Sequence, residues 1–418
     1  MKQSRLQLPL VSLVILTGLN LVNYLDRYVL SAVLTPIKVS LKLTDTQLGE
    51  LGVAFMLGYF VTAPIFGYLG DRMSRKGLIL SGVLVWCVGT CLSGFAHGFY
   101  TLICFRVLVG LGEASYGTLS PAWISDLYIP SKRNHVLSFF YSAIPVGSAL
   151  GFLFGGFIAL HYGWRAAFFL ASVPGLFFLT VLAYINEPQR GLSDGASDDL
   201  ISTLPRLGLL SAYRPLLSCP DYLRVVFGYT AQTFALGAFA FWGPTFLHRV
   251  RGLTLLDADK FFGSALVVTG LVATLLGGLW GTYWKKKRSN AYAFILALSA
   301  TLAIPFTLIS FTALDPTIFK TAFIFAMFFI FLSTGPTNTL ILETVPVGMR
   351  ASAMAASIFV IHLFGDLSSP YIVGHLSDQL GDLQKAVLYL LPVALAVCAL
   401  IWSLLALGFR SHTVKPAS

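Results

Sequence analysis

Twelve long apolar runs divide the 418-residue chain, and they restrict its fold more than any other feature. A helix needs about 20 apolar residues to span the hydrocarbon core of a bilayer. The runs are too long and continuous for the alternating strands of a membrane β-barrel. We therefore predict an all-α membrane protein with twelve transmembrane helices. The runs occupy roughly residues 10–34, 47–69, 77–98, 100–127, 134–160, 165–186, 222–248, 259–283, 290–311, 318–342, 350–376 and 385–409.

The composition excludes a water-soluble domain. Hydrophobic residues make up 56% of the chain and charged residues 11%, whereas soluble chains carry about 25% charged residues. The net charge of +10 would favour nucleic acid as a partner in a soluble protein. Here most Lys and Arg residues fall on one side of the membrane once the N-terminus is placed in the cytoplasm, as the positive-inside rule requires. We therefore expect no nucleic-acid partner and two cytoplasmic termini.

Cysteines and catalytic motifs argue against an enzyme. The cysteine count is odd, at five, most of the cysteines lie inside apolar runs, and none has CxxC spacing, so neither a disulfide framework nor a metal site is expected. The chain has no Walker A motif and no Ser/His/Asp order in a soluble segment. We expect no enzymatic activity and no cofactor other than a coupling proton.

A polar stretch after the sixth run divides the chain into two sets of six helices. We predict an N-terminal six-helix bundle over residues 1–186, a cytoplasmic linker over 187–221 and a C-terminal six-helix bundle over 222–418. The second part of the linker, Leu200 to Leu217, is partly amphipathic and is expected to lie along the membrane surface.

The two halves resemble each other faintly. Asp126 precedes Arg133 by seven residues after the fourth run, and Glu343 precedes Arg350 by seven after the tenth. The string from Gly67 to Lys76 also has a degenerate copy that begins at Gly278, in which Thr282 replaces the acid. Secondary transporters are commonly built from such repeats, with the substrate site between them near the middle of the membrane.

Glycines recur at helical spacing in two of the runs. Gly147, Gly151 and Gly155 are four residues apart in the fifth run, and Gly277 and Gly281 are four apart in the eighth. Small residues at this spacing let neighbouring helix backbones approach closely. We therefore predict close helix packing at both places, although glycine is also tolerated on faces that meet lipid.

Ionisable groups within the apolar runs indicate a functional site, because burying a charge in hydrocarbon is costly. Asp26, Arg27, Arg106 and Glu113 lie inside the first and fourth runs. Arg106 and Glu113 are two helical turns apart on one face, with glycines beside them that leave room for a helix or cavity. Loss of water favours a protonated acid and a nearby arginine favours the carboxylate, a balance that suits proton coupling. The alternative is an Asp26/Arg106 or Arg27/Glu113 pair that only fixes the helices.

Other polar side chains are weaker candidates for substrate contact. Asn23 and Tyr24 accompany Arg27 in the first run. His362 and Asp366 share a face of the eleventh run, before Pro370 interrupts the helix. The remaining candidates lie in the seventh and tenth runs, where packing is the alternative interpretation: Gln232, Trp242 and Asn338.

Charges at the cytoplasmic ends of the runs are interpreted as a gate. A cationic turn with an acid follows Gly67, and a glycine there lets two helices approach while the acid pins one element to another. We predict a network that closes one conformation and opens in another, with solvated loop charges as the alternative. Its members are Gly67, Asp71, Arg72, Arg75, Asp126, Arg133 and Glu187.

Four strings resemble a known family. The string Gly67–Lys76 resembles the loop between helices 2 and 3 of major facilitator superfamily transporters. Three others resemble the Spinster branch of that superfamily, which includes sphingosine-1-phosphate and lysophospholipid transporters. They are Asn23–Arg27, Arg106–Tyr116 and His362–Pro370 with its continuation to Asp378.

The resemblance implies two six-helix bundles that rock around a central cavity for an amphiphile. By motif, Asp26, Arg106 and Glu113 become candidates for proton coupling and for the head group, with Arg27 and His362 secondary. The long tails of animal members have no counterpart, so we expect a bacterial chain in the inner (plasma) membrane. We also expect it to act as a monomer.

Several functions remain open. The leading hypothesis is proton-coupled transport of a lysolipid-like or sphingolipid-like amphiphile. A proton-coupled carrier of small organic anions, such as sugar acids, is the main alternative. A multidrug exporter and a non-transporting lipid sensor are the others.

Overall fold

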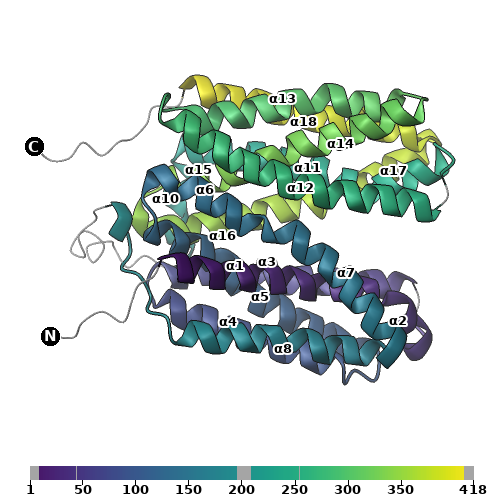
Figure 1. Cartoon of the computed structure of the whole chain (residues 1–418), viewed down its shortest axis with the longest axis horizontal. Helices are drawn as coiled ribbons and strands as arrows, with labels where there is room; N and C mark the ends of the chain where they lie inside the picture. Colours follow the sequence, from purple (N-terminus) through teal and green to yellow (C-terminus); the bar gives the residue numbers. More distant parts are fainter. Residues whose placement is uncertain (1–8, 44, 195–208, 254, 409–418) are drawn as a thin grey trace, which may run out of the picture. The chain divides into compact units, whose positions relative to one another are not determined.

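The computed structural model describes residues 9–43, 45–194, 209–253 and 255–408. Every regular element in these ranges is helical, and 12 helical segments are long and apolar enough to cross a membrane. This confirms the predicted fold class (Figure 1). The helices of the first half are α1 (Pro9–Ala32), α2 (Leu34–Leu41), α3 (Asp45–Gly70), α4 (Arg75–Ser93), α5 (Phe99–Leu127), α6 (Pro130–Tyr141), α7 (Ala143–Tyr162), α8 (Trp164–Ala183) and the 3-10 turn η1 (Leu192–Asp194).

The second half of the chain continues the same pattern, with two short interruptions near its end. Its helices are α10 (Leu209–Leu217), α11 (Pro220–Arg249), α12 (Leu255–Lys285), α13 (Ala291–Thr312), α14 (Pro316–Leu332), α15 (Thr334–Glu343), the 3-10 turn η2 (Val347–Met349), α16 (Arg350–Ile361), the π-helical turn η3 (His362–Asp366), α17 (Ser369–Leu380) and α18 (Leu383–Gly408).

The chain forms two compact units. The first runs to Pro130 and continues over Phe140–Tyr213 and Val347–Phe359, and the second holds Ser131–Phe139, Arg214–Pro346 and the chain from Val360 onward. Compared with the predicted halves, the units exchange one short segment each. The first half of the predicted amphipathic stretch, residues 200–208, and both chain termini lie outside the described residues, while its second half, Leu209–Leu217, forms α10.

Glycines set the helix spacing in the first unit. A Cβ added at Gly110 of α5 would lie 2.1 Å from the carbonyl oxygen of Phe55 in α3, so these two helices meet backbone to backbone. Gly147 and Gly151 of α7 approach the carbonyls of Leu21 and Leu25 in α1 equally closely. The close packing predicted from the glycine spacing is therefore confirmed here.

Aromatic side chains fill much of the second unit. Phe239, Phe246 and Phe311 lie ring against ring, with centroids 4.7 to 5.5 Å apart, within a buried apolar cluster. Figure 1 shows α13 alongside α14 and α18 in this unit. A Cβ added at Gly277 of α12 would lie 2.0 Å from the Leu332 carbonyl oxygen. The close packing predicted for the eighth run is thus also present.

Local chemistry explains where several helices begin and end. The Ser74 hydroxyl accepts a hydrogen bond from the Gly77 amide and so caps the start of α4. Asp315 caps α14 in the same way, just before a proline in the first turn, where a missing N–H costs nothing. Gly163, at a φ of 83°, separates α7 from α8, a conformation that glycine adopts without steric cost.

The eleventh run is interrupted earlier than the sequence indicated. The π-helical turn η3 begins at His362, and Gly365 within it has φ and ψ of −102° and −106°, which are not helical values. Pro370 lies in the first turn of α17, where its ring fits the new helix. The helix predicted to be interrupted at Pro370 is therefore already interrupted at Gly365, five residues earlier.

Candidate functional site

Four charged side chains from two helices converge inside the first unit. Asp26 and Arg27 lie on α1, and Arg106 and Glu113 lie on α5. Asp26 and Glu113 are 0% exposed and Arg106 is 1% exposed. Charges buried this deeply persist only when they are paired or serve a function.

Arg27 pairs with Glu113. Its Nη2 and Nε atoms donate to one carboxylate oxygen of Glu113, at 2.8 and 3.2 Å. The guanidinium also lies over three aromatic rings, with centroids 4.7 Å away at Tyr24, 4.9 Å at Phe55 and 5.1 Å at Tyr59. One of the two pairings considered from the sequence is therefore present, and it is surrounded by faces that attract a cation.

Asp26 has a neutral partner. The Thr90 hydroxyl of α4 donates to its Oδ2 atom at 2.5 Å, and both side chains are fully buried. The second oxygen, Oδ1, has no hydrogen-bond partner. Adjacent residues of α1 thus meet different helices, as their angular separation of about 100° requires.

Arg106 is the unsatisfied cation of the group. Its Nε and Nη1 atoms have no hydrogen-bond partner, and it takes part in no ion pair with any residue that the structure describes. It lies near enough to Asp26, Glu113 and Arg27 to interact with their charges, and its guanidinium is 5.0 Å from the centre of the Phe55 ring. A buried guanidinium with free donors is suited to an anionic group.

Two of the weaker candidates in the second unit are satisfied by packing. The Gln232 amide of α11 donates to the Ile330 carbonyl and to the Ser333 hydroxyl, the latter at 2.6 Å. The Asn338 amide of α15 donates to the Thr334 carbonyl at 2.9 Å. Both side chains are buried. The Gln232 contacts join α11 to the end of α14, and the Asn338 bond lies within α15. Both are in line with the packing interpretation.

The other candidates of the second unit gather at the π-helical turn. His362 Nδ1 lies 3.0 Å from both carboxylate oxygens of Asp366, whose side chain is 35% exposed. The Trp242 indole donates to the Pro370 carbonyl at 3.0 Å. Residue Gly237 of α11 leaves no room for a Cβ against Asp366. π-Turns occur often at functional sites, and this one presents a partly accessible acid.

The predicted gate is built around Asp71. Its two carboxylate oxygens accept hydrogen bonds from the amides of Ala351 and Ser352, at 3.0 and 2.9 Å. These amides open α16, where the positive end of the helix dipole favours an anion. Nearby, a Cβ added at Gly67 would lie 2.4 Å from the Ala355 side chain, so the first and fifth residues of the Gly67–Lys76 string both contact α16.

Asp126 links the gate further. It pairs with Arg75 on one oxygen and with Arg350 at 3.3 Å on the other, and Arg350 also contacts Asp194 at 2.7 Å. The Gly191 amide donates to Asp126 as well. All of these residues belong to the first unit.

The segment after α8 wraps the turn between α3 and α4. Glu187 accepts hydrogen bonds from the Ser74 hydroxyl at 2.6 Å and from the Arg75 amide at 2.8 Å, and so caps α4. Arg190 donates to three carbonyls at the end of α3 and in the turn, among them Gly70 at 3.0 Å. From the sequence, Arg190 and Asp194 were assigned only to a polar linker. Their position shortly after the sixth apolar run was the one feature that could have indicated a role in the gate.

Arg72, also predicted for the gate, is exposed; it donates to the Tyr68 carbonyl at 3.0 Å and lies 3.8 Å from the Tyr68 ring centre. Arg133 is 1% exposed and belongs to the second unit. Within the first unit, the structure brings together Gly67, Asp71, Arg75, Asp126 and Glu187.

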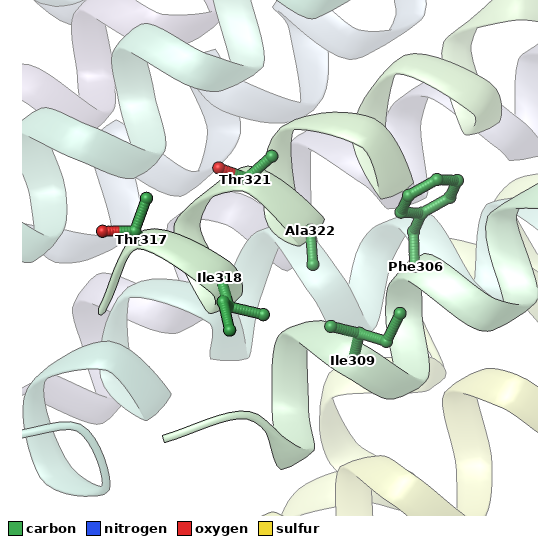
Figure 2. Close-up of a pocket in the computed structure, with 6 residues that line it drawn as sticks. All are labelled: Phe306, Ile309, Thr317, Ile318, Thr321 and Ala322. Carbon is green, nitrogen blue, oxygen red and sulfur yellow. The ribbon is translucent and has the colours of Figure 1, made fainter. Parts of the chain in front are cut away.

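A shallow hollow of about 290 Å³ lies elsewhere, between α13 and α14 of the second unit (Figure 2). No charged side chain lines it, and none of its residues was predicted as a site. Its lining is Phe306, Ile309, Thr317, Ile318, Thr321 and Ala322. An apolar, open lining of this kind is ordinary for a surface that meets lipid.

Comparisons with known proteins agree with the fold. The model of the Major Facilitator Superfamily matches residues 16–368. Protein spinster homolog 1 of Xenopus tropicalis is 35% identical, covering 93% of this chain and 77% of that protein. The sphingosine-1-phosphate transporter SPNS2 of Danio rerio is 32% identical, covering 97% of this chain and 81% of that protein.

Solved structures share the architecture. A bacterial homologue of the human lysosomal transporter Spinster, in an inward-facing and unoccupied conformation, superposes with a TM-score of 0.62 at 22% identity. The superposition covers 97% of this chain and 96% of that one. Together with the sequence matches, these findings show that the chain is a transporter of the Spinster family within the Major Facilitator Superfamily.

Proposed function

We propose that this Spinster-family transporter carries a lysolipid-like amphiphile with an anionic head group, and that it does so together with a proton. The relative named as a sphingosine-1-phosphate transporter supports the substrate class. The single observation that carries the proposal is Arg106, a fully buried arginine with two free donors beside two buried acids. The proton is the coupling ion, and no other cofactor is required.

The charges of the cluster provide the coupling. With both acids ionised, Asp26 and Glu113 balance Arg27 and Arg106, and an incoming anion competes with Asp26 for the field of Arg106. Protonation of Asp26 removes that competitor, so the anion binds more tightly to Arg106. By reciprocity the bound anion favours the proton. Proton and anionic substrate therefore bind together, as a symporter requires.

The remaining candidates take supporting roles. Asp366 and His362 contribute polar substrate contacts from the second unit. Asn23 and Tyr24 of α1 lie beside the charge cluster and contribute to substrate binding there. The gate around Asp71 and Asp126 holds one conformation by anchoring α16, and it opens when the carrier changes state. In this proposal the gate lies on the cytoplasmic side of the inner membrane, and the carrier acts as a monomer.

A carrier of small organic anions is the second candidate. Arg106 recognises an anionic group whether or not a hydrocarbon tail is attached, so the same observation supports both substrates. The two proposals differ in the need for the tail. A lysophospholipid and glucuronate, which is a sugar acid, therefore serve as contrasting substrates.

The first experiment measures uptake of a labelled lysophospholipid and of glucuronate into proteoliposomes, with and without an imposed pH gradient. Wild type is compared with Asp26→Asn, which fixes the proposed proton site in a neutral form, and with the control Glu50→Gln, an exposed acid at the start of α3. We expect gradient-stimulated lipid uptake that Asp26→Asn loses, while its gradient-free exchange remains and the control behaves as wild type. Glucuronate uptake without lipid uptake would reject the lipid proposal, and gradient-independent uptake by wild type would reject proton coupling.

A further inference from the structure

The Thr90 hydroxyl makes a different hydrogen bond from those of other threonines in the same unit. Thr118 of α5 donates to the Ala114 carbonyl one turn earlier, at 2.6 Å, and Thr62 of α3 donates to Gly58 in the same way. This backbone bond is the usual one for threonine within a helix. Thr90 instead donates across to Asp26 at 2.5 Å.

We propose that Thr90 is a positioning residue for proton coupling, whose hydroxyl sets the pH at which Asp26 releases its proton. A donor bonded to a carboxylate favours the ionised form, and the Thr90 hydroxyl has one proton to donate. Asp26 is completely buried. Among the described residues, no cation is bonded to it, and the Thr90 hydroxyl is its one direct hydrogen-bond partner.

The other groups around Asp26 do not replace that contact. Arg27, the next residue on α1, is held by Glu113 of α5. Arg106 of α5 acts on Asp26 through space, without a hydrogen bond. The Cys87 thiol of α4 also faces this region. The short bond from α4 is therefore the contact most sensitive to a change in the charge of Asp26.

This assignment also brings a third helix into the coupling site. Asp26 and Glu113 lie on α1 and α5, whereas Thr90 lies on α4, which ends three residues later at Ser93. When Asp26 takes up a proton, the attraction between its carboxylate and the Thr90 hydroxyl weakens. A change in protonation is then transmitted to α4 as a loosened tie to α1.

The inference rests on the proposed proton coupling, and its test needs no substrate. The infrared carboxyl band of the purified protein is titrated against pH, and the part that disappears in Asp26→Asn is assigned to Asp26. Thr90→Val removes the hydroxyl and keeps the shape, Thr90→Ser restores it, and Thr118→Val is the matched control. Transport of the lysophospholipid is measured over the same pH range.

We expect the Asp26 midpoint of Thr90→Val to rise by about one pH unit, as the loss of one hydrogen bond to a charged group predicts. The transport profile should move in the same direction, while Thr90→Ser and Thr118→Val follow wild type. An unchanged or lowered midpoint in Thr90→Val would overturn the assignment. Absence of any titrating Asp26 band in wild type would instead count against proton coupling at this site, and so against the proposed function.

Discussion

At the scale of single residues, the buried pair of Arg27 and Glu113 makes the stability of the first unit sensitive to substitution of either residue. Each partner offsets the desolvation of the other, and a buried pair left with one member is far more costly than no pair at all. The Arg27 guanidinium also lies close to three aromatic rings. A lysine would not reproduce these contacts, because its ammonium is a compact and strongly hydrated charge.

We therefore predict a strongly non-additive pair of substitutions. Arg27→Gln or Glu113→Gln alone should destabilise the protein by about 3–5 kcal/mol, because each leaves one uncompensated buried charge. The double variant should recover most of that loss. Thermal unfolding of the purified variants measures the cycle. Simple addition of the two losses in the double variant would contradict an energetically coupled pair.

The same residues mark the limit of prediction from sequence. The four membrane-depth charges were identified as a group because charge in an apolar run is rare. Two pairings remained open, since helical spacing assigns faces but not the rotation of α1 against α5. The bond from Thr90 was not predicted, because a threonine in an apolar run gives no sign of whether it bonds its own helix or a neighbour.

At the scale of elements, the contact between the α3–α4 turn and α16 depends on a few polar atoms. Asp71 satisfies two of the amides that open α16, amides that a helix leaves without partners of its own. Burial raises the pKa of the Asp71 carboxyl above its ordinary value, while Arg75 and the two amides act in the opposite direction. The contact is therefore sensitive to acid as well as to mutation.

We predict that Asp71→Ala increases hydrogen exchange at Ala351 and Ser352 by about tenfold, the scale of a lost helix cap. Asp221→Ala is the control, because that acid lies in the first turn of α11 and bonds the Arg224 side chain. Mass-spectrometric exchange of the peptide that begins at Arg350 makes the measurement. Unchanged exchange in Asp71→Ala would mean that this carboxylate does not hold α16.

We also predict an acid dependence of the same contact. Because the pKa of Asp71 is raised in the folded protein, the folded state binds this proton at a higher pH than the unfolded chain does. Acidification through that window thus favours folding through this group, yet it weakens the local tie to α16. Exchange at Ala351 and Ser352, corrected for intrinsic rates, should begin to rise above the pH at which an ordinary Asp titrates. A rise confined to the ordinary range of an aspartate would contradict a raised pKa, and would show that the amides and Arg75 offset the effect of burial.

Long-range contacts account for the gate residues that sequence reasoning missed. Asp71, Arg75 and Asp126 were visible because they belong to motifs at the ends of spans. Arg190 and Asp194 were not, since their partners are more than 60 residues away along the chain and a polar segment after a span is usually solvated. The π-helical turn was not predicted either, because in a sequence a proline such as Pro370 is a stronger sign of a helix break than a glycine such as Gly365.

At the scale of the whole molecule, the two halves repeat one device with different residues. Asp126 at the end of α5 pairs with Arg75, which opens α4. Glu343 at the end of α15 pairs with Lys285, which closes α12, at 3.4 Å. An acid at the end of a span thus meets a cation at the adjacent turn in both halves. In the second copy, which has Thr282 in place of the acid, Asn134 of α6 donates instead to the Gly278 carbonyl of α12 at 2.8 Å.

The repeat and the distribution of cations lead to a prediction about orientation. Cationic turns lie after α3 and after α12, and the positive-inside rule places both in the cytoplasm. In a variant without native cysteines, Met73→Cys and Lys286→Cys should resist a membrane-impermeant maleimide in intact cells and react after permeabilisation. Leu314→Cys, in the exposed turn between α13 and α14, should react in intact cells. The opposite labelling pattern would contradict this orientation and would place the proposed gate on the outer side of the membrane. The pH gradient that drives uptake would then have the opposite direction across the protein.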